Sequence, residues 1–458
     1  MPLSVLNNLF SSVRTGSSQP TNSFERRSVY QRDFDRIIFS SAFRRLQNKT
    51  QVFPLPGSVL VHNRLTHSLE VASVGRSLGN LVGHRISEEM NSALTEESLL
   101  FYKYDFYNVL ASACLCHDIG NPPFGHAGED AIANFFRNNS ELKPYFTESE
   151  WADYLQFDGN ANAIRVLTYS PKHPREGGLQ LTHTTLAAMA KYPCESIASD
   201  KKYIYRKKFG FFQTEKELFS TIANSTAMLN VNENPLIYYR HPFVWLVEVA
   251  DDICYNIIDL EDAHRLGIIE FDVCFNLLRL LLKEIGLDNQ EIIDKKLDSI
   301  YYKNDKISYL RAKIIAALTN YSAEVYINHL PLFLNGNFPQ SILDTVVAKS
   351  EALKQIIHFS IENVYNHVQV VEIENAGYNI MGELLSFFIP SVLRTPEQRN
   401  SYDKKVIRLL PYPYNSENKD VKLRVQGVVD YIASMTDDFA TNLYRRIKGI
   451  DMGMKFTE

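Results

Sequence analysis

An adjacent histidine and aspartate follow an apolar run, and they are the first candidates for a catalytic or metal-binding role. His117 and Asp118 follow the apolar residues 109–115, and a glycine and two prolines within residues 120–123 end the expected helix. Neighbours inside a helix point about 100° apart, but an open last turn lets an imidazole and a carboxylate converge on one ion. The stretch therefore offers two candidate metal ligands.

A second histidine and a glutamate follow a few residues later. His126 lies between Gly125 and Gly128, and Glu129 directly follows Gly128. Both residues belong to the start of another expected helix. Residues three apart share a helix face, so the carboxylate can orient the imidazole as carboxylates do in hydrolytic triads. The two residues are a candidate acid/base pair.

A long apolar helix expected over residues 243–262 carries polar groups at helical spacing. Asp251, Tyr255 and Asp259 recur at i, i+4 and i+8 on one face. A carboxylate on a buried helix is costly unless it meets a cation or donors. An exposed face is the alternative, although the apolar density around these residues argues against it.

His67 is the fourth candidate ligand. It lies in the first turn of a helix expected to run to about residue 90, with Thr66 as a candidate cap. Taken alone, such a histidine is more often a satisfied surface or core residue than a ligand. Together with the other candidates it completes a set of two imidazoles and two carboxylates: His67, His117, Asp118 and Asp251.

This ligand set suits Mn²⁺, Fe²⁺, Co²⁺ or Zn²⁺, with Mg²⁺ at lower affinity. A metal ion held there would polarise a phosphoryl group and help to organise a nucleophilic water. The sequence has no serine or cysteine motif for covalent catalysis and no GxxxxGK[ST] phosphate loop. Metal-assisted hydrolysis is therefore the chemistry that the residues indicate.

Helical patterns predict the elements that position these residues. They dominate from residue 268 onward, alternating strand patterns are few, and residues 140–156 are expected to be irregular. With 45% hydrophobic and 22% charged residues the composition is globular. We expect a loose lead-in over residues 1–25 and one large all-α domain over 26–450, with an insert near 195–220.

Net charge and cysteine content indicate which cellular compartment and which kinds of partner to expect. The formal net charge of −5 gives no overall argument for nucleic acid or a membrane. No apolar run approaches the roughly 18 residues of a membrane span, and the first ten residues lack the pattern of a signal peptide. Five cysteines without a CxxC pair favour a reducing compartment. We expect a cytoplasmic protein with no membrane contact.

Two local basic segments remain. Six arginines within residues 26–45 are either a solvated helix face or a wall that binds phosphate. Lysines, arginines, tyrosines and phenylalanines alternate within 201–212, as on a platform for single-stranded nucleic acid. A short basic hairpin on the surface of an enzyme is the alternative that we favour for this second segment.

Three motifs in order carry a resemblance to a known family. They are RLTHS at 64–68, HDIGNPPFGHAGE at 117–129 and ADDICY at 250–255. A bare His-Asp pair carries almost no information, but this ordered set resembles the HD-superfamily phosphohydrolases and, among them, the deoxyguanosine triphosphate triphosphohydrolases. The likeness runs from about residue 26 to 444 and includes segments 44–53 and 431–437.

The resemblance implies an all-α fold with an HD-domain helical core and additional helices, and a role for each candidate. It implies metal ligation by the four residues above and catalysis by His126 and Glu129. The implied cofactor is Mn²⁺ or Mg²⁺ first, then Fe²⁺, Co²⁺ or Zn²⁺. The implied substrate contacts are Gln51 at the guanine edge, Tyr255 and Asp259 near the sugar, Arg45, Lys191 and Tyr192 at the triphosphate, and Asn160 as a further lining residue.

The resemblance also implies a reaction and partners. Water would attack the α-phosphorus of dGTP and release deoxyguanosine and inorganic triphosphate, which would regulate dNTP pools. Family members form homo-oligomers, with a hexamer as one form, and some bind single-stranded DNA. A broad dNTP triphosphohydrolase is the alternative, because glutamine can pair with other bases. A single-stranded nucleic-acid-binding protein with a vestigial site is a third reading, against which the intact ligand set argues.

Overall fold

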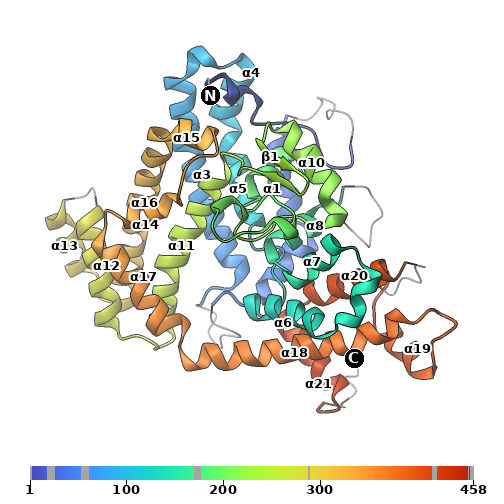
Figure 1. Ribbon diagram of the computed structural model, residues 1–458. Coiled ribbons are helices and arrows are strands. Elements are labelled where there is room, and N and C mark those ends of the chain that lie inside the picture. The colour runs from blue at the N-terminus through green and yellow to red at the C-terminus, as the bar shows by residue number, and fades with distance from the viewer. Residues whose placement is uncertain are drawn as a thin grey trace.

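Helices make up most of the chain (Figure 1). The computed structural model describes residues 3–17, 26–52, 61–169, 177–286, 289–414, 420–451 and 453. The helices of the first half are α1 (Val29–Ile38), α2 (Ser41–Arg45), α3 (Arg64–Glu89), α4 (Glu96–Tyr104), α5 (Phe106–Cys116), α6 (Gly125–Asn138), α7 (Glu148–Leu155), α8 (Gly159–Thr168), α9 (His183–Met189) and α10 (Lys216–Ser225).

The second half continues in the same way. Its helices are α11 (Val244–Arg265), α12 (Phe271–Ile285), α13 (Gln290–Ser299), α14 (Lys303–Asn328), α15 (Leu330–Leu334), α16 (Ile342–Val347), α17 (Glu351–Ser360), α18 (Val368–Leu393), α19 (Ser401–Arg408), α20 (Val421–Ala433) and α21 (Asp437–Ile447). The strands in the described part of the chain form one antiparallel hairpin, β1 (Asn230–Glu233) and β2 (Leu236–Tyr238). The expected all-α fold with few strands is confirmed.

Helices α3, α5 and α11 form the centre of the larger hydrophobic cluster. Three glycines spaced four residues apart on α3 let neighbouring helices approach closely. Gly75 and Gly79 face α5, and Gly83 faces the end of α4 and the start of α5. A Cβ atom at Gly79 would lie 2.5 Å from the Cα atom of Tyr107, and one at Gly83 would lie 2.3 Å from the carbonyl oxygen of Tyr102. Because α3 carries His67 and α5 ends next to His117, this close approach sets the distance between two candidate ligands.

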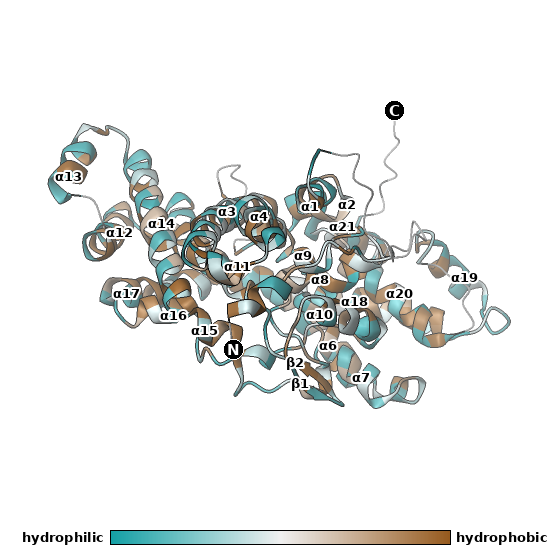
Figure 2. Cartoon of the chain, turned by 90° about the horizontal axis from the view of Figure 1, so that it is seen from above, coloured by the Kyte–Doolittle hydropathy of each residue, from teal (hydrophilic) through white to brown (hydrophobic). Residues whose placement is uncertain are grey.

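A second hydrophobic cluster joins α6 and α7 to α18 and α20. In Figure 1 α18 runs from the lobe formed by α12, α14 and α17 to the group of α6, α20 and α21. Hydrophilic and hydrophobic residues occur along the same helices in Figure 2, as expected for helices that bury one face. The central cavity described below is lined by residues of both regions.

Helix α18 differs from the expectation that no segment reaches the length of a membrane span. Its 26 residues have a mean hydropathy of 1.2 over the most apolar window, and half of that window is buried. Length and composition of one helix are weak evidence for a span, because core helices share them. Helix α18 packs on α6, α19, α20 and α21, which is the packing of a core helix.

Several expected boundaries are wrong. Residues 140–156 are not irregular: they contain a 3₁₀ turn and α7. Thr147 and Glu150 form a reciprocal cap at the N-terminus of α7. Residues 3–17 are not a loose lead-in: Arg14 is buried and its guanidinium pairs with Asp33 at 2.6 Å. The helical pattern of residues 341–359 predicts one helix, but these residues form two, α16 and α17, since Ser350 caps the second. Two prolines and a glycine predict a helix break at 51–57, a segment that lies mostly outside the described residues.

The insert near 195–220 is not a hairpin. It consists of three short 3₁₀ segments, Ser196–Ala198, Ile204–Arg206 and Gln213–Glu215, which precede α10. Its phenylalanines are core residues and not an exposed stacking surface: Phe209, Phe211 and Phe212 are all at most 2% exposed. The insert therefore anchors itself in the core, and it directs one lysine, Lys208, to the central cavity.

Candidate functional site

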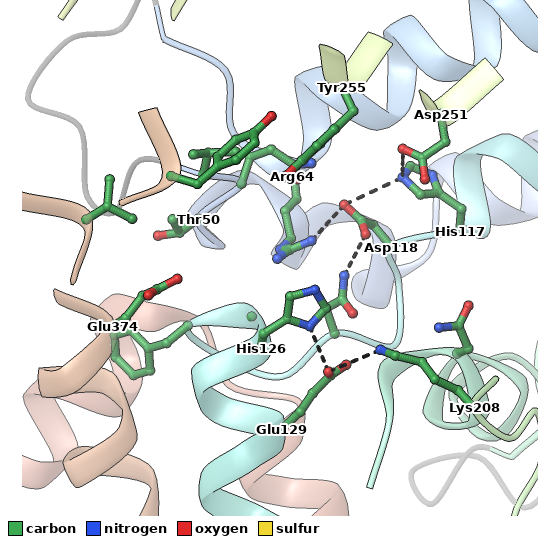
Figure 3. Close-up of a pocket in the computed structure, with 18 of the residues that line it drawn as sticks. Thr50, Arg64, His117, Asp118, His126, Glu129, Lys208, Asp251, Tyr255 and Glu374 are labelled. Carbon is green, nitrogen blue, oxygen red and sulfur yellow. Dashed lines mark hydrogen bonds and ion pairs between the residues drawn. The ribbon is translucent and has the colours of Figure 1, made fainter. Parts of the chain in front are cut away.

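Three candidate ligands converge where α3 and the end of α5 meet. Ligand atoms of His67, His117 and Asp118 all lie within 4.8 Å of one another. The Oδ1 atom of Asp251 on α11 lies 3.1 Å from Nε2 of His67. The same atom lies 3.4 Å from Nε2 of His117 (Figure 3). The four residues come from three separate parts of the chain, and the close α3–α5–α11 packing brings them together.

The histidine of the His-Asp pair has the orientation of a metal ligand. Its Nδ1 atom lies 2.6 Å from the carbonyl oxygen of Cys114, and a carbonyl can only accept, so Nδ1 carries a proton and Nε2 is the atom left for a metal ion. The Nε2 lone pair then faces the cluster. This Nε2 atom is buried and has no hydrogen-bond partner among the described residues. A backbone carbonyl behind a ligating imidazole is a common arrangement in metal sites, and the residues present fit a divalent ion.

Cations balance both carboxylates of the cluster. Burial would raise the pKa of Asp118, but the Arg64 guanidinium, 2.8 Å away, and the neighbouring histidines hold it at about 2. Burial acts in the same direction on Asp251, yet Lys191, whose Nζ atom is 3.1 Å away, and His117 and His67 hold its pKa well below the usual range. Both groups are carboxylates at neutral pH, as metal ligands must be.

The second pair lies on the opposite wall of the cavity. In Figure 3 His126 and Glu129 project from the start of α6, and Nδ1 of the imidazole is 2.9 Å from Oε2 of the carboxylate. The other Glu129 oxygen accepts the backbone N–H of Gly159 at 2.7 Å. The His126 side chain is 82% exposed, so its Nε2 atom is open to a ligand in the cavity.

Each member of the His126–Glu129 pair shifts the pKa of the other. The hydrogen bond that Nδ1 of His126 donates to Glu129 is the largest effect on His126 and raises its pKa. Burial would raise the pKa of Glu129, but the bond to His126 and the charge of Lys208 keep it below the usual range. The pair therefore favours an imidazolium beside a carboxylate, which is the state of a general acid.

The turn before His126 has an uncommon backbone. Phe124 has φ 61° and ψ 21°, the left-handed region, and Gly125 follows with φ 55°. For a residue other than glycine this conformation costs about 1–3 kcal/mol and persists only where the surroundings hold it. The turn reverses the chain between the His-Asp pair and α6, and it places His126 across the cavity from Asp118.

A cavity of about 540 Å³ lies between the two groups. Most of the residues singled out in the sequence line it: Gln51, His117, Asp118, His126, Glu129, Asn160, Lys191, Tyr192, Asp251 and Tyr255. His67 lies behind this wall, only 1% exposed, and reaches the cluster through Asp251. The volume is in the range of small-molecule sites, about 300–1,000 Å³.

Two of the expected substrate contacts lie elsewhere. Arg45 lines a separate cavity of about 380 Å³ between α2, α8 and α20, together with Arg165 and Tyr169. Asp259 is buried one turn below Tyr255, where the hydroxyl of Tyr365 donates to it at 3.1 Å, and burial raises its pKa to about 8. Spacing on a helix face identified the right face for Asp259 but could not show that a tyrosine covers it.

Two family patterns match the chain. The HD domain pattern matches residues 64–169, and the phosphohydrolase-associated domain pattern matches residues 342–446. Proteins from Synechocystis sp. and Listeria monocytogenes, both named deoxyguanosinetriphosphate triphosphohydrolase-like protein, are 39% and 36% identical to the chain. The first alignment covers 97% of this chain and 99% of the relative, and the second covers 93% and 94%. A Yersinia pestis protein named deoxyguanosinetriphosphate triphosphohydrolase is 28% identical over 94% of this chain and 96% of the relative.

The chain belongs to the deoxyguanosinetriphosphate triphosphohydrolase-like family. It is thus an HD-domain hydrolase, and the resemblance found in the sequence is confirmed. Within this chain the HD domain match begins at the first residue of α3 and includes all residues of the His-Asp turn. The associated-domain match contributes the opposite part of the cavity wall through Tyr365, Val370, Ile373 and Glu374.

Further residues of the cavity were not expected from the sequence. Lys208 lies in the basic insert, and its Nζ atom is 2.5 Å from Asp158 and 3.8 Å from Glu129. Arg64 was assigned no role from the sequence, yet its guanidinium binds Asp118. Tyr365 stacks on Tyr255 with ring centroids 5.2 Å apart. The alternation of charge and aromatic residues in the insert was the available signal for Lys208, whereas nothing in the sequence pairs Tyr365 with Tyr255.

Proposed function

We propose that this chain hydrolyses dGTP to deoxyguanosine and inorganic triphosphate in a reaction that needs a divalent metal ion. One observation carries the proposal: a single cavity has the His/Asp cluster on one wall, the His126–Glu129 pair on another and the lysines 191 and 208 beside them. Cations and a metal cluster in one cavity suit a polyphosphate substrate. The names of the relatives point to dGTP.

The metal would be held by His67, His117, Asp118 and Asp251, and we propose Mn²⁺ or Mg²⁺ as the ion. When bound, the ion supplies charge stabilisation at the α-phosphate and lowers the pKa of a water ligand. The protein itself keeps both carboxylates ionised through Arg64 and Lys191 and orients His117 through the Cys114 carbonyl. These contacts prepare the site, so that little reorganisation is needed when the ion binds.

We assign proton transfer to the His126–Glu129 pair. Departure of the nucleoside requires a proton on its 5′-oxygen, and the imidazolium form that Glu129 stabilises can donate one from Nε2. Glu129 keeps the ring oriented and is itself fixed by the Gly159 amide. The pair thus works as a general acid and its orienting carboxylate.

The remaining contacts are proposed from the cavity walls. Lys191, Tyr192, Lys208 and Asn160 lie on the side of the metal cluster and the acid/base pair, where they would bind the triphosphate. Tyr255, stacked on Tyr365, would pack against the deoxyribose. Asp259 accepts a hydrogen bond from the Tyr365 hydroxyl, and it would act on the sugar through this tyrosine. Arg45 lines a separate cavity, and its contact with triphosphate stays a prediction.

Gln51 would read the base. Its Oε1 atom is buried and has no hydrogen-bond partner among the described residues, and the side chain lines the cavity. A buried acceptor without a partner costs about 1–3 kcal/mol unless a ligand satisfies it. The N–H groups on the edge of guanine are donors that would do so.

Organisation and partners are proposed on the same basis. A single domain over residues 26–450 is supported by the shared cavity, which takes its walls from both matched regions. The homo-oligomer, single-stranded DNA as a ligand, and the cytoplasmic location stay predictions from the resemblance. The exposed lysines and Tyr203 of the insert are the surface on which DNA contact would be tested first.

Product analysis tests the proposal. The protein is incubated with each dNTP in the presence of Mn²⁺, Mg²⁺ or a chelator, and nucleoside and phosphate products are separated. We expect deoxyguanosine and intact triphosphate from dGTP, with no product in chelator. Diphosphate or monophosphate as product would contradict attack at the α-phosphorus, and equal rates with all four dNTPs would favour the broad dNTP triphosphohydrolase.

Replacing Gln51 by alanine is expected to change base preference. The variant loses the buried amide that pairs with the base, so the ratio of kcat/KM for dGTP to that for the other dNTPs should fall by about 10-fold, corresponding to one hydrogen bond of roughly 1–1.5 kcal/mol. Competition assays with paired dNTPs measure the ratio directly. An unchanged ranking of the four substrates would exclude the role of Gln51.

A further inference from the structure

Asp437 lies at the first residue of α21, far from the catalytic cluster in sequence, and its carboxylate is completely buried. Three donors surround it. Oδ1 accepts the backbone N–H of Phe124 at 3.0 Å, and Oδ2 accepts the backbone N–H and the hydroxyl of Thr50 at 2.9 and 2.5 Å. A buried carboxylate is tolerated where donors of this kind satisfy it. Both partners line the central cavity.

Phe124 is the strained residue of the turn before His126. A left-handed backbone at a phenylalanine persists only where its surroundings fix it. Asp437 holds the amide, and α18 holds the ring: a Cβ atom at Gly377 would lie 2.3 Å from Cγ of Phe124. Both supports thus come from the phosphohydrolase-associated part of the chain. Gly125, next along the turn, is the residue directly before His126.

Lys49 forms a parallel connection beside Thr50. Its side chain is buried, and Nζ donates to the carbonyl oxygens of Ala433 at 3.0 Å and Asn121 at 2.5 Å. The Asn121 amide in turn donates to Oδ1 of Asp118 at 2.6 Å. Lys49 therefore links the end of α20 to the His-Asp turn. The adjacent residue, Thr50, contacts the start of α21 through Asp437.

We propose that Asp437 is a positioning residue for hydrolysis: it holds the Phe124 turn that aims His126 and the Thr50 segment that carries Gln51. The inference rests on the proposed function for its catalytic consequence. It assigns a role to the associated helices, which would complete the substrate cavity from behind. Asp437 touches neither the ligand cluster nor His126 within hydrogen-bonding distance in the described residues, so its effect passes through Phe124 and Thr50.

The test compares Asp437→Asn with a matched control. An asparagine amide has one accepting atom where the carboxylate has two, so the variant cannot satisfy both Phe124 and Thr50. We expect kcat for dGTP to fall by about 10- to 100-fold, as for a small misplacement of a catalytic group, together with a weaker preference for guanine. Asp438→Asn removes the same charge from the same helical turn at an exposed position and is expected to keep both parameters.

Metal binding separates positioning from general damage. Mn²⁺ affinity, measured by titration in the absence of nucleotide, is expected to be retained in Asp437→Asn, because the four candidate ligands lie on α3, the end of α5 and α11. Loss of metal binding together with turnover would show that the substitution disrupts the whole site and would overturn the proposal. So would kcat and KM equal to those of the parent protein.

A second pair of variants decides the matter if Asp437→Asn does not fold. Thr50→Val removes one bond to Asp437 and keeps the backbone amide, whereas Thr50→Ser keeps the hydroxyl. We expect Thr50→Val to raise KM about three- to tenfold, the effect of one hydrogen bond, and Thr50→Ser to restore it. Equal KM values for the two variants would contradict the role of Asp437 at this segment.

Hydrogen exchange supplies a readout that does not need turnover. In the protein without nucleotide, amides of peptides covering residues 121–129 are expected to exchange faster in Asp437→Asn than in the parent or in Asp438→Asn. If no dNTP is hydrolysed by the parent protein, the proposed function fails while this difference still tests the support of the turn. Unchanged exchange in Asp437→Asn would refute the inference even where the parent is active.

Discussion

Replacing Asp118 by alanine is expected to abolish metal binding and to lower turnover of dGTP by at least about 10³-fold, because a metal ion supplies several kcal/mol of transition-state stabilisation. The substitution removes one carboxylate of the cluster and leaves Arg64 without its partner at 2.8 Å. Titration calorimetry with Mn²⁺ measures the binding, and product formation under saturating substrate measures the turnover.

The adjacent aspartates on α11 provide a matched control for the ligand set. Asp251 contacts both histidines, whereas no ion pair within 4.0 Å joins Asp252 to either histidine in the described part of the chain. Asp251→Asn is therefore expected to behave like Asp118→Ala, and Asp252→Asn is expected to keep Mn²⁺ affinity. The reverse order of effects, or full activity in Asp118→Ala, would refute the assignment of the ligands.

Replacing His126 by alanine is expected to lower kcat by about 10²- to 10⁴-fold, the usual contribution of a general acid, and to leave Mn²⁺ binding intact. The imidazole projects into the cavity from α6 and does not belong to the ligand cluster. Steady-state kinetics with dGTP and a parallel metal titration separate the two properties. A loss of metal affinity equal to that in Asp118→Ala would mean that His126 acts as a ligand.

The pH dependence follows from the partner of His126. A general acid must be protonated, so activity is expected to fall as pH rises through the pKa of His126, which the hydrogen bond to the Glu129 carboxylate raises above its ordinary value. In Glu129→Gln the carboxylate charge is gone and the imidazolium loses that stabilisation. The alkaline limb of the kcat profile should then move to lower pH. A limb that moves to higher pH, or does not move, would exclude the acid role.

The sequence was sufficient for the residue types and for their local geometry. His126 and Glu129, three apart on one helix, pair as helical periodicity requires. The polar face of α11 was visible from the spacing of Asp251, Tyr255 and Asp259. The apolar run before His117 forms α5, and the glycine and prolines end it as expected. These are properties of a few neighbouring residues, and local backbone geometry decides them.

Long-range packing determined the features of the site that the sequence did not predict. Gly75 and Gly79 bring α3 against α5, and only that approach places His67 within reach of Asp251 and His117. The basic insert looked like a surface hairpin because alternation alone does not show which aromatic residues are buried. In the structure its phenylalanines enter the core and Lys208 turns to the cavity. Arg45 was expected at the triphosphate, but it lines a separate cavity, together with residues of α8 and α20.

By itself, the sequence determined the family, the helical fold and the identity of the candidate ligands and acid/base pair, because each depends on motifs of adjacent or helically spaced residues. Only the tertiary structure decided which distant residues complete the cavity. Tyr365 reaches Tyr255, and Asp437 reaches Phe124 and Thr50, across more than a hundred positions in each case. Contacts over such separations depend on how whole helices pack, and no local pattern in the chain encodes them.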